Sequence, residues 1–364
     1  METGPNHVLE EDEQRLWATV IEEEKRIEQS GLLYTDAAVN EYLTSVIRKL
    51  SPPELTPGLL TVEVQVLKNP LLNAFAFPNG KIYVHTGMLA RIQNEAQLAT
   101  LLGHELTHAT HRHTIQELRG VRWATAALAT LHMVALPFGV FGLAATTLGT
   151  VGTLGSVTGY SRGKEREADE EGLCLMVKAG YSPQEAPKFF EHLKEEITFR
   201  KVKEPYFFGS HPKVQDRIDS FHDLLKSEYP GQDGEVGDDR YNVVMAPLVI
   251  DNAETDLAIG RFELAQRDLE RILHKQSRNA RAHYLLGEVC RQRKGNRDAE
   301  LSEGHYRRAI EIDPGLPGAH RALGYALFKR GDGQNAKAEL QKYLELAPNA
   351  SDRAYVEQVL KESP

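Results

Sequence analysis

The chain has 364 residues, of which 41% are apolar and 26% are charged, a composition that excludes a largely disordered chain and a collagen-like one. Its formal net charge of −9 argues against a general nucleic-acid binder, which needs a basic surface to attract phosphates. Two cysteines, Cys174 and Cys290, allow at most one bridge and exclude a disulfide scaffold. The length suits two or three domains.

The start of the chain shows no secretory signal, because no cationic segment is followed by an apolar stretch. We therefore expect either a cytosolic protein or one whose signal has been removed. A later stretch, residues 123–161, contains no Asp, Glu, Lys or Arg. It is long enough to span a membrane, but His132, Pro137 and six glycines dilute its hydropathy. We expect a buried or interfacial helical hairpin there, with a membrane-dipping segment as the alternative.

The first third of the chain combines a helical pattern with a strand pattern. Residues 8–50 carry apolar side chains at helical spacing between acidic runs and predict an amphipathic N-terminal helix. Between residues 60 and 87, apolar and polar residues alternate with the period of a strand. Pro78-Asn79-Gly80 predicts the turn of a hairpin whose strands are 73–77 and 81–85.

A second helical region follows the hairpin. Asn94, with Gln97 three residues later, is typical of a helix N-terminus, and the leucines after it mark one helix face. The turn-rich, acidic segment 231–239 predicts a linker between a first domain, 1–230, and a second domain, 240–364. Within the first domain we expect a helix over 94–116, an apolar lid-like region over 121–160, and helices over 164–180, 183–199 and 213–228.

The second domain repeats itself with a period of about 34 residues. Gly260 and Gly331 are two periods apart, allowing for a short insertion, and Gly287 corresponds to Gly324. Small residues let the two helices of a hairpin cross closely, so the period predicts tetratricopeptide repeats, with a generic helical array as the alternative. Repeats of this kind bind extended peptides or protein partners.

The strongest local pattern is His104-Glu105-Leu106-Thr107-His108. Histidines four residues apart lie on one face of a helix, so His104 and His108 can converge on one metal ion, with Glu105 beside it. Imidazole nitrogens suit zinc, and a catalytic zinc needs a third protein ligand and an open position for water. The pattern therefore indicates a zinc hydrolase in which Glu105 is the general base.

The residues alone leave the third ligand open. His111 and His113 are more simply explained as a solvated helix end, and we expect His113 to point away from the site. Glu165 and Asp169, four residues apart, share a helix face. Glu165 is a candidate ligand, and Asp169 is a candidate acceptor for a hydrogen bond from a ligand imidazole.

The H-E-x-x-H pattern is followed by S-R-x-x-E-x-E-A-D-x-x-G between Ser161 and Gly172. This combination resembles the zinc metallopeptidases that include the CAAX prenyl protease, HtpX and Oma-type proteases. The hairpin region resembles that family too, and the likeness covers about residues 10–230. It implies a mainly α fold with a small β-sheet, a minigluzincin-like peptidase domain with one zinc ion (Zn2+), and helical repeats behind it. The repeats point to the soluble periplasmic bacterial branch.

The resemblance also implies residue roles. Glu165 would be the third ligand, and Asp169 would orient a ligand histidine. His211 and Arg217 lie in a further family motif and are candidates for a fourth ligand or an oxyanion partner. His211 would occupy the open position as an inhibitory ligand or assist as an oxyanion partner. The alternative is that His211 caps the helix from 213. A substrate chain would extend along an edge strand at Asn73, Ala74 and Phe75.

Together these features predict a metalloendopeptidase that cleaves misfolded or unassembled cell-envelope proteins. Its repeats would recruit polypeptide substrates or protein partners, and we expect no nucleic-acid partner. The resemblance implies a periplasmic location, with 123–161 as the candidate for peripheral membrane contact. The lack of several clear spanning helices argues against prenylated substrates. The alternative function is a chaperone or adaptor that binds through its repeats and has a latent protease site.

Overall fold

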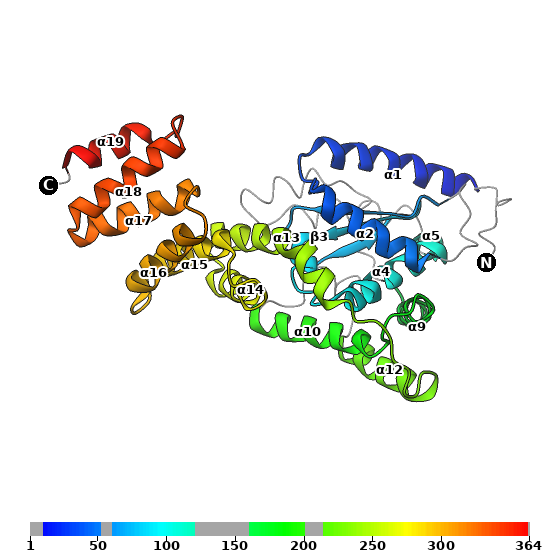
Figure 1. Ribbon diagram of the computed structural model, residues 1–364. Helices are drawn as coiled ribbons and strands as arrows, with labels where there is room; N and C mark the ends of the chain where they lie inside the picture. Colours follow the sequence, from blue (N-terminus) through cyan, green and yellow to red (C-terminus); the bar gives the residue numbers. More distant parts are fainter. Residues whose placement is uncertain (1–9, 52–59, 121–159, 201–213, 363–364) are drawn as a thin grey trace. The chain divides into compact units, whose positions relative to one another are not determined.

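The computed structural model describes residues 10–51, 60–120, 160–200 and 214–362 (Figure 1). The chain divides into two compact units, Met1–Met245 and Ala246–Pro364. The predicted lid-like region 121–160, apart from Tyr160, and the predicted position of His211 lie outside the described residues. The fold is mainly helical with one small sheet, as expected.

The N-terminal region forms two helices and not the single helix predicted over 8–50. These are α1 (Glu11–Gln29) and α2 (Ala37–Leu50). The chain turns at Gly31, whose φ of 71° lies in the left-handed region that favours glycine. The side chain of Asp36 then accepts a hydrogen bond from a backbone N–H of the next turn and starts α2.

The sheet has three strands in the order β1-β3-β2. The strand β1 (Glu63–Leu67) pairs in parallel with β3 (Lys81–His85), and β2 (Ala74–Ala76) pairs with β3 in antiparallel fashion. The predicted hairpin is therefore confirmed. It turns at Gly80, which has a φ of 95°. In the described part of the chain, β2 pairs only with β3, so its other edge lies outside the ladder.

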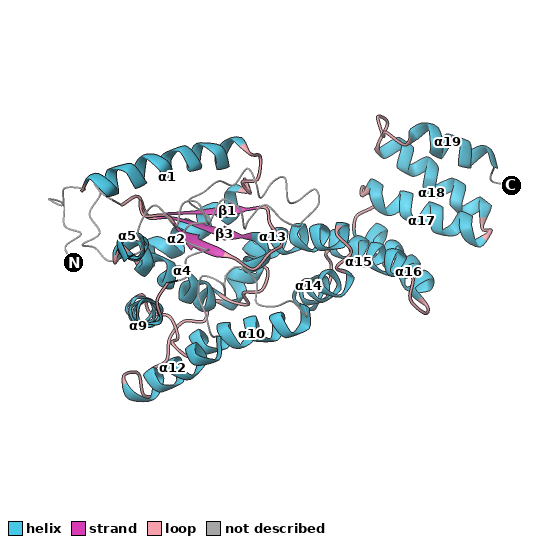
Figure 2. Cartoon of the chain, turned by 180° about the vertical axis from the view of Figure 1, so that it is seen from behind, coloured by secondary structure: helices cyan, strands magenta, loops and turns pink. Residues whose placement is uncertain are grey.

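Helix α1 lies on one side of the sheet, and α4 (Glu95–Thr110) lies on the other (Figure 2). Val20 and Ile27 of α1 pack against Leu67, Phe77 and Tyr83, which face that side of the sheet. Each side chain of this size contributes roughly 1.5–3 kcal/mol when it is fully buried. This packing fixes the sheet whose opposite face supports α4.

The predicted helix 94–116 is broken into two. Helix α4 ends at Thr110, and α5 (His113–Gly120) begins after a tight turn. Arg112 in this turn has a φ of 57°, which costs a residue with a Cβ roughly 1–2 kcal/mol. The other helices among the described residues of the first unit are α3 (Thr86–Leu89), α9 (Arg162–Lys178), α10 (Glu185–Arg200), α12 (Val214–Ser227) and the start of α13 (Asp238–Ala258).

The segment predicted as a linker, 231–239, is hydrogen-bonded to the first unit. The N–H of Glu235 donates to the carbonyl of Gly180 at 2.9 Å, and its own carbonyl accepts from Ser182 at 3.0 Å. The carbonyl of Val236 accepts from Ala96 in the first turn of α4 at 3.0 Å. These bonds connect the segment to the start of the H-E-x-x-H helix.

The second unit consists of helical hairpins. Gly287 and Gly324 lie where helices cross, because a Cβ at Gly287 would overlap the ring of Tyr306 and a Cβ at Gly324 would lie 2.7 Å from the side chain of Leu340. Among the described helices, none combines the length and the hydropathy that crossing a membrane requires. The helices that follow α13 are α14 (Phe262–Lys275), α15 (Ala280–Arg293), α16 (Asp298–Ile312), α17 (Pro317–Arg330), α18 (Gly333–Leu346) and α19 (Arg353–Glu362).

Candidate metal centre

Helix α4 begins with a defined cap, which fixes the direction of the H-E-x-x-H motif nearly three turns later. The side chain of Asn94 accepts a hydrogen bond from the N–H of Gln97 at 2.9 Å. The side chain of Gln97 accepts in return from the N–H of Gln93, one residue before the cap. These bonds satisfy backbone donors that a helix start leaves without partners.

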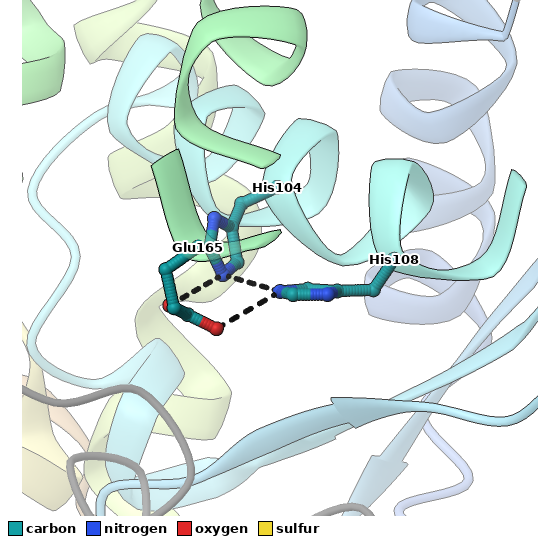
Figure 3. Close-up of side chains that lie close together, drawn as sticks. All are labelled: His104, His108 and Glu165. Carbon is teal, nitrogen blue, oxygen red and sulfur yellow. Dashed lines mark hydrogen bonds and ion pairs between the residues drawn. The ribbon is translucent and has the colours of Figure 1, made fainter. Parts of the chain in front are cut away.

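His104, His108 and Glu165 lie together and are all buried (Figure 3). The two histidines extend from α4, and Glu165 extends from the first turn of α9. The Nε2 atoms of the histidines are 3.0 Å apart. The carboxylate of Glu165 lies 3.3 Å from Nε2 of His108 and 3.7 Å from Nε2 of His104.

The close crossing of α4 and α9 brings these residues together. A Cβ added to Gly103 would lie 2.9 Å from the carbonyl oxygen of Gly172, and one added to Gly172 would lie 2.8 Å from the N atom of His104. Two residues without a Cβ therefore let the helix backbones touch. This contact places the carboxylate side of α9 directly against the histidine side of α4.

The donor set fits a zinc ion. A tetrahedral zinc with bonds of about 2.0–2.1 Å holds its ligand atoms about 3.3 Å apart. The two imidazole nitrogens are 3.0 Å apart, and the two oxygens of Glu165 lie 3.3 Å from His108 and 3.7 Å from His104, all close to this value. Two imidazoles and one carboxylate are also the ligand chemistry of a catalytic zinc that keeps one position for water. Within the described ranges, this is the one group of three such side chains that fits a metal ion.

Behind His104 lies a buried ion pair. The Nδ1 atom of His104 is 2.9 Å from a carboxylate oxygen of Asp169. The guanidinium of Arg217, on α12, donates through Nε to Asp169 at 2.8 Å and lies over the ring of Phe190. Burial lowers the pKa of Arg217, but the charges of Asp169 and Glu165 outweigh burial, and the net shift is upward. Arg217 also lies 3.4 Å from Nε2 of His104 and 3.5 Å from the carboxylate of Glu165, so it contacts the candidate ligands themselves.

Behind His108 lies a third histidine, and its predicted orientation away from the site is wrong. His113 is fully buried, and its Nδ1 atom is 2.9 Å from Nδ1 of His108. The expectation that His113 points away assumed one continuous helix, whereas the turn at Arg112 returns the chain toward the site. Burial and the neighbouring His108 lower the pKa of His113 to about 4. His111, at the C-cap of α4, does remain at the surface, with 37% of its side chain exposed.

Tyr160 covers one face of the site and was also missed. Its ring stacks on that of His108, with centroids 3.9 Å apart and planes 16° from parallel. Its hydroxyl lies 2.9 Å from the hydroxyl of Thr114 in α5. No pattern singles out this tyrosine, because it lies at the end of the long uncharged stretch 123–161. The four histidines between 104 and 113, by contrast, were a visible signal for an extended histidine cluster.

The remaining predicted residues occupy different places. Glu105 is buried on α4, next to His104 in sequence. Asn73 and Ala74 are buried at the start of β2, and Phe75 packs against the rings of Phe77 and Tyr83. A substrate chain would thus meet the backbone edge of β2 and not the Phe75 side chain.

Two histidines and a carboxylate from crossed helices, supported by a small sheet and followed by helical hairpins, define a metallopeptidase domain joined to a repeat domain. Residues 37–224, more than half of the chain, match peptidase family M48, and residues 250–317 match the tetratricopeptide repeat. The chain belongs to peptidase family M48. The family expected from the sequence is therefore confirmed.

Several curated relatives have similar sequences. The putative beta-barrel assembly-enhancing protease of Vibrio cholerae is 29% identical over 202 residues, which cover 54% of this chain and 40% of that protein. The beta-barrel assembly-enhancing protease of Escherichia coli is 27% identical over 203 residues, covering 53% and 40%. The mitochondrial metalloendopeptidase OMA1 of Arabidopsis thaliana is 37% identical over 131 residues, covering 36% and 25%. The chain thus covers at most 40% of the length of these relatives.

Proposed function

We propose that this chain is a zinc-dependent endopeptidase that cleaves misfolded or unassembled proteins of the cell envelope. The observation that supports the chemistry is the buried convergence of His104, His108 and Glu165. The names of the relatives, beta-barrel assembly-enhancing protease and metalloendopeptidase, support the substrate class. On the same basis we propose a periplasmic location and retain 123–161 as the candidate for membrane contact.

The chain's own residues have distinct tasks in this reaction. A zinc ion held by His104, His108 and Glu165 would activate a water molecule and polarise the scissile carbonyl. Glu105 accepts the proton of the attacking water and delivers it to the nitrogen of the leaving amine. Asp169 orients His104 through the hydrogen bond to Nδ1. Burial of all five side chains strengthens each of these electrostatic interactions.

The substrate would bind as an extended chain along β2. This strand lies at the edge of the sheet, and backbone groups at a free edge pair with an added strand. Within the candidate segment 73–75, Ala74 would then supply main-chain hydrogen bonds, because the carbonyl of Asn73 already accepts from the N–H of His85 and Phe75 alternates with it toward β3. The repeat unit would recruit substrate or partner proteins. His211 lies outside the described residues, and we retain it as the candidate that blocks or assists the open metal position.

The alternative function is a chaperone or adaptor with a latent protease site. The repeat unit favours it, because Ala246–Pro364 is compact on its own and matches repeats that bind proteins. An intact Glu105 argues against it, since a purely structural metal site has no use for a general base. The two functions differ in whether bound substrate is cleaved.

The test is Glu105→Gln in the full chain, with casein as an unfolded substrate. We expect one zinc per chain, measured by elemental analysis, in both proteins, because Glu105 is not a ligand. We expect the variant to lose cleavage by about 100-fold or more, since general-base catalysis contributes roughly 10²–10⁴-fold. Gel electrophoresis with mass spectrometry of the fragments measures cleavage.

The control is Glu170→Gln, an exposed carboxylate on α9 that pairs with Arg166, and it should retain full activity. Equal cleavage by wild type and Glu105→Gln would contradict the assignment of the base. A zinc-loaded wild type that binds casein but leaves it intact would favour the adaptor.

A further inference from the structure

His113 has the environment of a functional residue and not of a solvated helix end. Its side chain is fully buried at the first turn of α5, and its two ring nitrogens face different partners. Nδ1 lies 2.9 Å from Nδ1 of His108, and Nε2 lies 3.4 Å from a carboxylate oxygen of Glu167. A chain of three side chains therefore extends from the metal-facing histidine to a half-exposed carboxylate.

The position of one proton follows from this geometry. Nε2 of His108 faces His104 and Glu165, and a nitrogen that binds a metal ion carries no proton. A neutral His108 that binds through Nε2 must therefore carry its proton on Nδ1. Only one proton fits between two Nδ1 atoms 2.9 Å apart, so His108 donates and His113 accepts.

The position of the proton between the two Nδ1 atoms also determines the tautomer of His113. Because its Nδ1 accepts, its proton lies on Nε2, the nitrogen that faces Glu167. At 3.4 Å this carboxylate forms no hydrogen bond with Nε2, but its negative charge favours the tautomer that His108 requires. Tyr160 holds the His108 ring by stacking on its face, while His113 contacts its edge. Both the orientation and the tautomer of His108 are then determined by the protein.

We propose that His113 is a positioning residue that fixes the tautomer and ring orientation of His108 for metal binding, with Glu167 as its outer anchor. This proposal rests on the proposed zinc site and adds a residue outside the H-E-x-x-H pattern. Partners of this kind typically change metal affinity 10–100-fold when they are removed.

The test compares three variants of the full chain by zinc dissociation constant, measured by competition with a chromophoric chelator. His113→Leu removes the acceptor while filling the space, and we expect zinc affinity to fall 10–100-fold. His113→Asn places an amide oxygen near the position of Nδ1, and we expect affinity within about threefold of wild type. His111→Leu is the matched control, because His111 also faces Glu167, at 3.8 Å, and should leave zinc affinity unchanged.

A measurement on the wild type does not depend on how variants fold. Long-range ¹H–¹⁵N spectra of the zinc-loaded chain, labelled at histidine, report which ring nitrogen carries the proton. We expect the Nδ1–H form for His108 and the Nε2–H form for His113. An Nδ1–H form of His113 would overturn the proposal.

Failure of this inference is distinguishable from failure of the proposed function. If the wild type binds zinc and cleaves casein, but His113→Leu binds zinc as tightly, the positioning role is wrong and the peptidase assignment stands. Loss of affinity in both Leu and Asn variants would also overturn the role, since the acceptor would then not matter. A wild type that binds no zinc would overturn the proposed function, and the inference with it.

Discussion

The two histidines of the candidate site have different partners behind them. His104 is backed by Asp169 and Arg217, a pair of opposite charges that are 3% and 4% exposed. His108 is backed by His113, an imidazole that reaches a carboxylate, Glu167, whose side chain is 50% exposed. His104 thus contacts a buried pair of opposite charges. His108 contacts a neutral imidazole, which in turn faces a carboxylate exposed to solvent.

This difference predicts which partners affect the stability of the fold and which affect metal affinity. A buried ion pair is strongly coupled, because removing either partner leaves a charge without compensation in a medium of low dielectric constant. A carboxylate at the surface is screened by water, so its effect on a neighbour is small. We therefore expect the His104 side to dominate folding and the His108 side to influence metal binding with little effect on the fold.

The largest expected effect is that of Arg217→Met. The substitution leaves the carboxylates of Asp169 and Glu165 buried without their cation, and we expect the free energy of unfolding to fall by about 3–5 kcal/mol. Tryptophan fluorescence in urea with EDTA measures it. Both tryptophans of the chain, Trp17 and Trp123, belong to the unit Met1–Met245, so the signal reports on that unit alone.

A matched variant tests whether burial is the cause. Arg166 lies on α9, and 69% of its side chain is exposed. We expect Arg166→Met to change the free energy of unfolding by no more than about 0.5 kcal/mol. A loss below about 1 kcal/mol for Arg217→Met would remove the proposed distinction between the two sides.

Gly172→Ala should have the next largest effect, and it should act at the crossing of α9 and α4 beside His104. A Cβ there would lie 2.8 Å from the backbone N of His104, so α9 must move away from α4. We expect a loss of about 1–3 kcal/mol in the free energy of unfolding, the usual cost of overpacking. Zinc affinity should also fall, because Asp169 and Glu165 move with α9.

Gly163→Ala is the control, because it lies on the same helix and its Cβ would meet only a hydroxyl 3.9 Å away. It should retain wild-type zinc affinity. If Gly172→Ala also retains it, the crossing does not set the position of Glu165.

The sequence predicted the parts of the fold that depend on local periodicity. The hairpin at Gly80 follows from alternation and a turn signal, and the repeats follow from glycines such as Gly287 and Gly324 at a fixed period. The two missed breaks, at Gly31 and Arg112, are single residues with positive φ inside helical patterns. A lone glycine predicts such a break weakly, and an arginine does not predict it at all.

The site was only partly predictable, because local sequence patterns do not determine how distant helices pack. The spacing of His104, His108 and Glu165 indicated candidates, but their proximity depends on two helices crossing at glycine, which is tertiary packing. Arg217, a candidate fourth ligand or oxyanion partner, contacts His104 although the two residues are 113 positions apart in the chain. The predicted orientation of His113 assumed that the helix containing His104 and His108 continues, whereas α4 ends at Thr110.

Glu167→Gln should have the smallest effect and is the sharpest test of the difference between the two sides. The amide removes the charge that faces Nε2 of His113 but keeps an oxygen that can accept its proton. Because the carboxylate is half-exposed, we expect zinc affinity to fall by less than about threefold, with no change in the unfolding curve. Glu170→Gln, one turn further along the same helix, is 48% exposed and serves as the reference for removing one surface charge. A tenfold loss for Glu167→Gln, absent in Glu170→Gln, would show that charge is transmitted through His113 to the metal ligand. Charge would then act on His108 as strongly as on His104, although the carboxylate of Glu167 is in contact with water.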